Sequence, residues 1–162
     1  QVVGGNAVGT NAGQSYSVGV KWASDFGLTL SAGYEATQDV VLVTAPGGVL
    51  TSTDIGNTSN IALGADYTTG ALTFKGRYAT GDFGVDVDQY AVSVDYTTGA
   101  TTLTAFYNTM ELEGAASDRE AYGIGAAYDL GGGATVAGGV AQVSDVFGDE
   151  ATIGDFGLKF NF

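Results

Sequence analysis

The sequence contains no cysteine and no histidine, and only five of its 162 residues are lysine or arginine. Without cysteine the chain forms neither disulfides nor thiolate metal sites, and without histidine it lacks the commonest general base and metal ligand. Eighteen aspartate and glutamate residues give a formal net charge of -13, which argues against a nucleic-acid partner, because phosphate binding requires basic patches. Divalent cations are the partners that this charge favours.

Long apolar runs are also missing, since no window reaches eighteen apolar residues, and this excludes a membrane-spanning helix. There is one proline and one methionine, whereas glycine occurs 27 times, tyrosine nine times and phenylalanine eight times. This mixture is poor in helix formers and rich in strand and turn residues, which predicts an all-β fold. A membrane-crossing β-strand needs only about ten alternating residues and leaves no long apolar run.

Apolar and polar residues alternate from Gln14 onward, as in strands with one apolar face, whereas residues 1–13 have the glycine-rich composition of a loop. One hairpin pattern occurs twice, 29 residues apart: Asp66-Tyr67-Thr68-Thr69-Gly70-Ala71 returns as Asp95-Tyr96-Thr97-Thr98-Gly99-Ala100. We expect about nine antiparallel strands, with short turns at one end and longer loops, about 37–57, 80–87, 109–118 and 144–150, at the other.

The aromatic residues supply the most specific pattern, because all nine tyrosines and the only tryptophan fall on the apolar face near expected strand ends. Tyr16, Tyr34, Tyr78, Tyr90, Tyr107 and Tyr122 lie at the long-loop end, and Trp22, Tyr67, Tyr96 and Tyr128 lie at the short-turn end. Two belts of amphipathic rings around an apolar band are typical of a transmembrane antiparallel β-barrel. The alternative is a soluble sandwich, which would place its bulky residues in the middle of strands rather than at the ends.

The last residues alternate strictly, with Phe156, Leu158, Phe160 and Phe162 on one side and Asp155, Gly157, Lys159 and Asn161 on the other. The ending Gly157-Leu158-Lys159-Phe160-Asn161-Phe162 resembles the terminal strand of alphaproteobacterial general porins, and the strand pattern extends the resemblance over residues 14–162. The resemblance implies a bacterial outer-membrane location among lipid and lipopolysaccharide, and a homotrimer. It also implies that Phe160 and Phe162 belong to the signal read by the barrel-assembly machinery.

Strand parity predicts that further strands precede this sequence. Nine strands ending on the periplasmic side would put residue 1 outside the cell, whereas single-chain bacterial barrels have even strand numbers and periplasmic termini. The start of the chain also lacks the basic and apolar regions of a signal peptide. We therefore expect the C-terminal part of one barrel domain of about sixteen strands, in which 14–162 are strands and 1–13 an external loop remnant.

The face opposite the apolar one is polar and rich in small residues, which suits a wall that meets water. The charged residues predicted to line a pore are the basic Lys21, Lys75, Arg77 and Lys159 and the acidic Glu35, Asp66, Asp95 and Asp155. A basic wall attracts anions locally, but the excess of carboxylates predicts weak cation preference for the whole pore. The alternative is that these are solvated charges without a dedicated role. Phe106 is the exception on this face, an inward-turned aromatic residue.

Further carboxylates gather in or beside the expected long loops: Asp82, Asp86, Asp88, Glu111, Glu113, Asp145, Asp149 and Glu150. Carboxylates from neighbouring loops can bind Ca²⁺ through six to eight oxygens, or bridge through cations to lipopolysaccharide phosphates. The alternative is a solvated acidic rim, since no loop has the twelve-residue EF-hand spacing.

Function is predicted to be transport rather than catalysis. With no histidine and no triad-like set of residues, an enzyme is not expected, and no cofactor is required. The leading hypothesis is a porin, a water-filled channel for passive diffusion of small hydrophilic solutes and ions. The second is a non-conducting structural or adhesive outer-membrane barrel, and the third is a secreted acidic β-rich protein.

Overall fold

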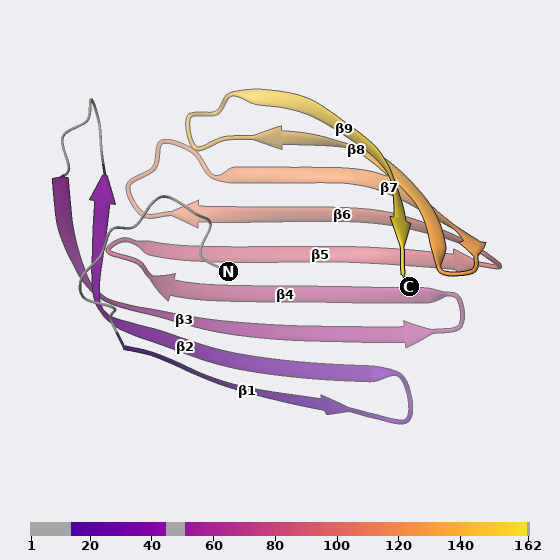
Figure 1. The fold of residues 1–162 in the computed structure, drawn as a ribbon, viewed down its shortest axis with the longest axis horizontal. Coiled ribbons are helices and arrows are strands. Elements are labelled where there is room, and N and C mark those ends of the chain that lie inside the picture. The colour runs from indigo at the N-terminus through magenta and orange to yellow at the C-terminus, as the bar shows by residue number, and fades with distance from the viewer. Residues whose placement is uncertain (1–13, 45–50, 162) are drawn as a thin grey trace.

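The computed structural model describes residues 14–44 and 51–161, the side chains of 41–44 and 51–55 excepted. Its strands are β1 (Ser15–Ala23), β2 (Leu28–Thr44), β3 (Thr51–Thr69), β4 (Leu72–Asp82), β5 (Asp86–Thr98), β6 (Thr101–Leu112), β7 (Arg119–Gly131), β8 (Ala134–Ser144) and β9 (Glu150–Phe160). Each strand pairs antiparallel with the next, so strand order follows chain order (Figure 1). The all-β prediction and the expected strand number are confirmed. No helix suited to crossing a membrane occurs in these residues.

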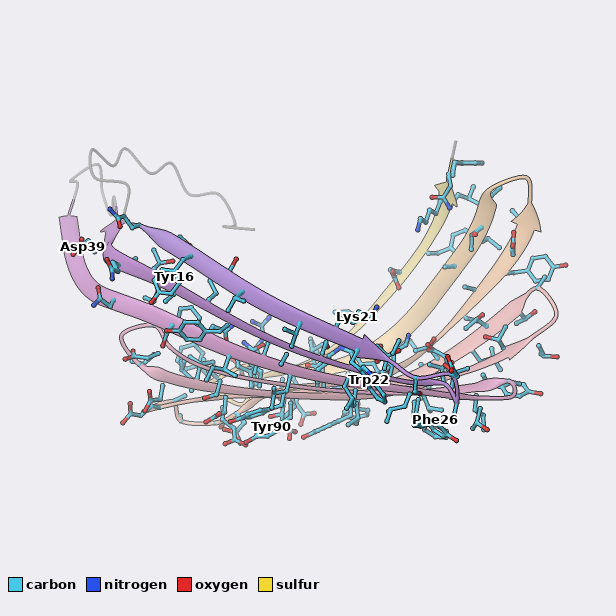
Figure 2. All side chains as sticks on the ribbon, turned by 90° about the horizontal axis from the view of Figure 1, so that it is seen from below. Tyr16, Lys21, Trp22, Phe26, Asp39 and Tyr90 are labelled. Carbon is cyan, nitrogen blue, oxygen red and sulfur yellow. The ribbon has the colours of Figure 1, made fainter. Side chains whose placement is uncertain are left out.

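The sheet is a single curved layer with one convex and one concave face (Figure 2). No second layer packs on either face within the described residues, and only Ala36, Val87 and Thr58 are buried among the side chains that the structure places. Large apolar side chains are open on the convex side, with Val20 69% and Phe156 79% exposed. A soluble sandwich would bury such a face against a second sheet. A continuous apolar surface of this kind requires another apolar phase or a protein partner to cover it.

The register between strands keeps each face chemically uniform. Trp22 pairs with Leu30 and Tyr78 pairs with Tyr90, so apolar residues meet apolar residues across the convex face. The rings of Tyr78 and Tyr90 lie 5.0 Å apart between centroids. Figure 2 shows Tyr90 on the convex side and Lys21 on the concave side. A slip of one residue would send every side chain of a strand to the other face, so the apolar pattern specifies the register strongly.

The two copies of the repeated sequence form equivalent hairpin turns, between β3 and β4 and between β5 and β6. Gly70 and Gly99 both have φ of 57°, a left-handed conformation that glycine adopts without steric cost. The threonine hydroxyls that flank each turn hydrogen-bond across it, at 3.1 Å between Thr68 and Thr73 and at 3.1 Å between Thr97 and Thr102. The same side chains therefore build the same turn twice.

The prediction of a loop over residues 37–57 is wrong, because β2 continues to Thr44 and β3 begins at Thr51. These strands have 17 and 19 residues, whereas the other strands described have between 9 and 13. Their register shifts near Val40, where Asp39 has φ of 55° and Gly56 has φ of 73°, and the long ends bend away from the sheet (Figure 1). The backbone ladder continues in this stretch, although apolar and polar residues of β2 do not alternate there in the sequence. The predicted external remnant 1–13 and Phe162 lie outside the described residues.

Candidate functional site on the concave face

The concave face carries all eight charged residues that were predicted to line a pore. Cross-strand register links Lys21 to Arg77 through Ser31 and Gly64, and places Asp66 opposite Lys75. A group toward the short turns is formed on β1, β3, β4 and β5 by Lys21, Asp66, Lys75, Arg77 and Asp95. The other three lie apart: Glu35 farther along β2, and Asp155 and Lys159 on β9. The predicted set is therefore one cluster with outlying charges.

Lys75 on β4 is bound to a carboxylate of β5. Its Nζ lies 2.6 Å from Asp95 Oδ2, and Thr104 Oγ1 donates a hydrogen bond of 2.6 Å to Asp95 Oδ1. The Asp95 side chain is only 15% exposed, so both of its oxygens are held against the wall. This contact links three neighbouring strands and leaves little of the Lys75 charge uncompensated.

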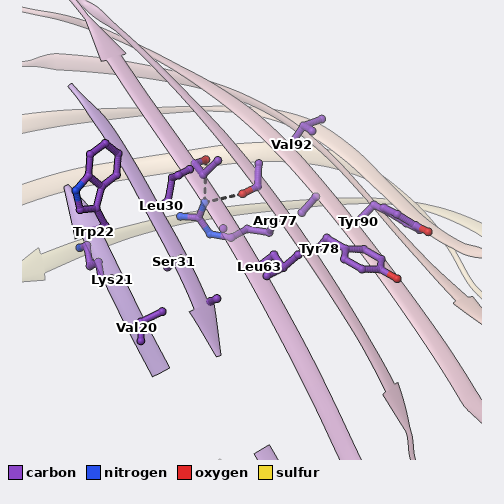
Figure 3. A pocket seen from close by; sticks show the side chains of 15 residues that line it. Val20, Lys21, Trp22, Leu30, Ser31, Leu63, Arg77, Tyr78, Tyr90 and Val92 are labelled. Carbon is purple, nitrogen blue, oxygen red and sulfur yellow. Dashed lines mark hydrogen bonds between the residues drawn. The ribbon is translucent and has the colours of Figure 1, made fainter. Parts of the chain in front are cut away.

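Arg77 on β4 reaches in the opposite direction, to β3. Its Nη1 lies 2.6 Å from Asp66 Oδ1. The same nitrogen donates hydrogen bonds to the backbone oxygens of Gly76, at 2.8 Å, and Ala65, at 3.2 Å (dashed lines in Figure 3). Asp66 Oδ1 has no well-aligned hydrogen bond, so its contact with Arg77 is an attraction of opposite charges. The two inner bases of β4 are thus each compensated by a different neighbouring strand.

Arg119, the fifth base, was not assigned a role by the sequence analysis. It begins β7 opposite Met110, whose alternation with Phe106 and Asn108 sets it on the concave face. In the described part of the chain Arg119 forms no salt bridge. Its alternation with Ala121 and Gly123 was the signal that could have revealed it, since the loop expected before this strand ended at residue 118. All five bases consequently share one face.

Two shallow hollows mark the concave face. One of about 590 Å³ is lined by Arg77, Gln89, Asn108, Met110 and Arg119, among other residues. Within it, Gln89 Nε2 donates a 3.5 Å hydrogen bond to the Met110 sulfur. The other hollow, of about 480 Å³, includes Phe106 above the glycines and alanines of β7 and β8. The first hollow includes two arginines and two side-chain amides, and the second includes Asp155 and no base, so the wall offers different polar groups to solutes along its length.

The convex face bears the ten predicted girdle residues. Two tyrosine hydroxyls at the long-loop end bind carboxylates: Tyr78 donates to Asp88 Oδ1 at 2.8 Å and Tyr107 donates to Glu120 Oε1 at 2.7 Å. Between the girdles a hollow of about 650 Å³ includes the small residues Ala32, Ala65 and Gly76 (Figure 3). Aromatic rings that border an apolar band and direct their hydroxyl groups toward polar partners are the arrangement expected at a membrane interface.

Strands β8 and β9 depart from this girdle. At the level of Tyr122, the register places Gln142 and then Thr152 on the convex face. Thr152 Oγ1 donates a 2.6 Å hydrogen bond to Gln142 Oε1, and Gln142 Nε2 donates one of 3.3 Å to Glu150. We call these three residues the amide patch. It carries polar groups in the register row where the neighbouring strands β7 and β6 carry Tyr122 and Tyr107.

The predicted calcium ligands do not converge. Within 14–44 and 51–161, no three carboxylates stand close enough to hold a metal ion. Asp82 pairs with Asp86, and Asp88 pairs with Glu111, as direct neighbours on adjacent strands. Asp145 instead accepts hydrogen bonds from the backbone of its own turn. Calcium binding therefore stays a prediction, since the described carboxylates do not form a calcium site.

A model of the Gram-negative porin family matches residues 1–146. A porin structure refined at 1.8 Å resolution is 28% identical with a TM-score of 0.71, over 94% of this chain and 52% of that one. A variant of the Rhodopseudomonas blastica porin is 28% identical with a TM-score of 0.61, over 93% and 45%. The anion-selective porin of Comamonas acidovorans is 17% identical with a TM-score of 0.72, over 91% and 49%. No curated protein sequence matched.

The chain spans about half the length of the solved structures it matches. Its nine strands therefore correspond to about half of a barrel of roughly sixteen strands. At 17% identity, the Comamonas structure supports the likeness of fold alone.

Proposed function

Because the chain belongs to the Gram-negative porin family, we propose that the protein carrying it forms an outer-membrane channel for passive diffusion of small hydrophilic solutes and ions. The observation that carries the proposal is the division of the sheet into two faces. The convex face is apolar between aromatic belts, and the concave face holds all five bases together with small and polar residues. A barrel closed with this curvature has lipid outside and water inside.

Planar-bilayer recording tests the channel directly. The natural polypeptide that carries this sequence, folded in detergent and added to a bilayer in potassium chloride, is expected to produce discrete steps of current. Heat-denatured protein in the same detergent is the control. A correctly folded, membrane-inserted protein that gives no steps would contradict a channel and favour a structural or adhesive barrel.

The proposal extends to the partners of the barrel, a homotrimer surrounded by lipid and lipopolysaccharide. The amide patch supports a protein contact on the outside of β8 and β9, because polar groups there gain little from lipid while tyrosine suits a membrane interface. The chain lacks cysteine, so single-cysteine variants take a fluorescent label at one chosen position. Brominated lipids should quench a label at Val92 strongly and a label at Thr152 weakly. Equal quenching at both positions would oppose a subunit contact on β8 and β9.

A further inference from the structure

The Arg77 side chain lies flat along the concave wall instead of extending into the lumen. Its path crosses β3 at Gly64, where an added Cβ would stand 3.3 Å from Arg77 Cδ and 3.4 Å from Nε. The same Cβ would stand 2.5 Å from the Ser31 hydroxyl on β2. Both approaches are tighter than normal van der Waals contact. Gly64 is therefore the place where the wall leaves room for the arginine stem.

Asp66 is the one carboxylate that receives the guanidinium at the end of this path, 2.6 Å from Nη1. The backbone oxygens of Gly76 and Ala65 accept hydrogen bonds from the same nitrogen, at 2.8 Å and 3.2 Å. The Arg77 side chain is nevertheless 48% exposed, so water competes for the guanidinium. A half-exposed arginine on a flexible stem keeps one position only while an opposite charge favours it.

The surroundings of Asp66 are basic. Lys75 is its direct cross-strand neighbour and Lys21 lies on the same face of β1, in the register row of Arg77. Lys75 binds Asp95, whereas Lys21 has no salt bridge within the described ranges. The cluster Lys21, Asp66, Lys75, Arg77 and Asp95 thus has three positive and two negative charges, a net of +1. Neutralising Asp66 would double that net charge to +2.

We propose that Asp66 is a positioning residue that sets ion selectivity by holding the Arg77 side chain against the wall at Gly64, the position that we call the seat. This inference rests on the proposed channel. An ion pair closed at 2.6 Å acts at a distance as a dipole, whose field falls off faster than that of a single charge. With Asp66 in place the wall presents only a weak field to the lumen. Without it, the guanidinium extends into water beside Lys21 and Lys75 and forms a site for inorganic anions and small carboxylates.

Reversal potentials under a potassium chloride gradient test the proposal, using Asp66→Asn against the control Glu35→Gln. Each variant removes one negative charge from the concave face, but Glu35 lies between Ser17 and Asn60 and makes no salt bridge in the described residues. We expect Asp66→Asn to raise the chloride-to-potassium permeability ratio by at least about twofold more than Glu35→Gln does at 0.01 M salt. The difference should shrink at 1 M salt, where the Debye length is about 3 Å. Equal ratios in the two variants would overturn the proposal.

A second variant changes no charge. Gly64→Leu fills the seat, so we expect Arg77 to leave the wall and the permeability ratio to move in the same direction as in Asp66→Asn. Adding Arg77→Gln to Gly64→Leu should abolish that movement. A Gly64→Leu channel with wild-type selectivity would overturn the role of the seat, whereas a wild-type protein without current steps would overturn the channel itself. The two failures are thus distinguishable in one set of recordings.

Discussion

Val92 and Ser93 are consecutive residues of β5 that face opposite media. Val92 is 57% exposed on the convex face, while Ser93 lies opposite Lys75 and Phe106 on the concave face. Val92→Arg would place a charge near the bilayer midplane and should lower the free energy of unfolding by about 2 to 4 kcal/mol. Ser93→Arg should fold with nearly wild-type stability and change ion selectivity. Denaturant titrations in lipid vesicles measure both, and equal losses would mean that the faces are assigned wrongly.

Lys75 and Arg77 give a second prediction at the same scale. Replacing both by glutamine removes two positive charges and leaves Asp66 and Asp95 without their ion-pair partners. We expect cation over anion permeability to rise, most clearly at 0.01 M salt, where the Debye length is about 30 Å. Lys159→Gln, which removes one base of β9 that forms no salt bridge with any described residue, is the comparison. If the double variant keeps wild-type selectivity at low salt, these two residues do not border the conducting path.

Much of this residue-level picture was predictable, because a period of two decides which face a side chain occupies. Lys75 and Asp95 were therefore placed on one face without a structure. Their contact was not predictable, since a partner depends on the register between strands and on how far a long side chain leans. Asp66 illustrates the limit: its direct neighbour is Lys75, yet its partner is Arg77. Arg119 was missed although the expected loop ended at residue 118, because the alternation of Ala121 and Gly123 was not followed back to the first residue of the strand.

Among the secondary-structure elements, the hairpin turns follow most directly from the amino-acid sequence. Gly70 has φ of 57°, and a Cβ added there would meet nothing within 4 Å, so an alanine suffers only from backbone strain. We expect Gly70→Ala to lower the free energy of unfolding by about 1 to 2 kcal/mol. Gly76→Ala, a strand glycine with equal space and no positive φ, should be neutral or slightly stabilising. Urea titrations in micelles compare the two, and a Gly76→Ala cost equal to that of Gly70→Ala would contradict the argument.

The long hairpin of β2 and β3 marks where sequence reasoning at this scale failed. Up to Ala36 apolar and polar residues of β2 alternate, as expected where one face contacts lipid, and Tyr34 is the last girdle residue of this strand. Beyond it the ladder continues to Thr44, although the residues no longer alternate. Alternation reports contact with two different media, whereas strand length depends on backbone pairing as well. A strand that leaves the membrane therefore loses its sequence signal before it ends.

For the whole molecule, the single layer predicts how the protein behaves in solution. Val20, Ile124 and Phe156 are 69%, 64% and 79% exposed, and no second layer in the described part of the chain covers them. We expect the protein to leave membranes only with detergent and to keep a β-sheet circular dichroism spectrum in micelles. Removing the detergent should cause aggregation, because the convex band then meets water. A protein that stayed monomeric and folded in plain buffer would instead match a secreted acidic β-rich protein.

The two copies of the repeated hairpin sequence bear on how the circumference of a barrel can change. One repeat of 29 residues holds one turn at the short end, one loop at the long end and a pair of strands. Duplicating it adds two strands, which widens the circumference by about 9.6 Å at 4.8 Å per strand before tilt. Because strands are added in pairs, every turn and loop keeps its side of the membrane. Gene duplication can therefore enlarge the barrel in even increments without inverting it.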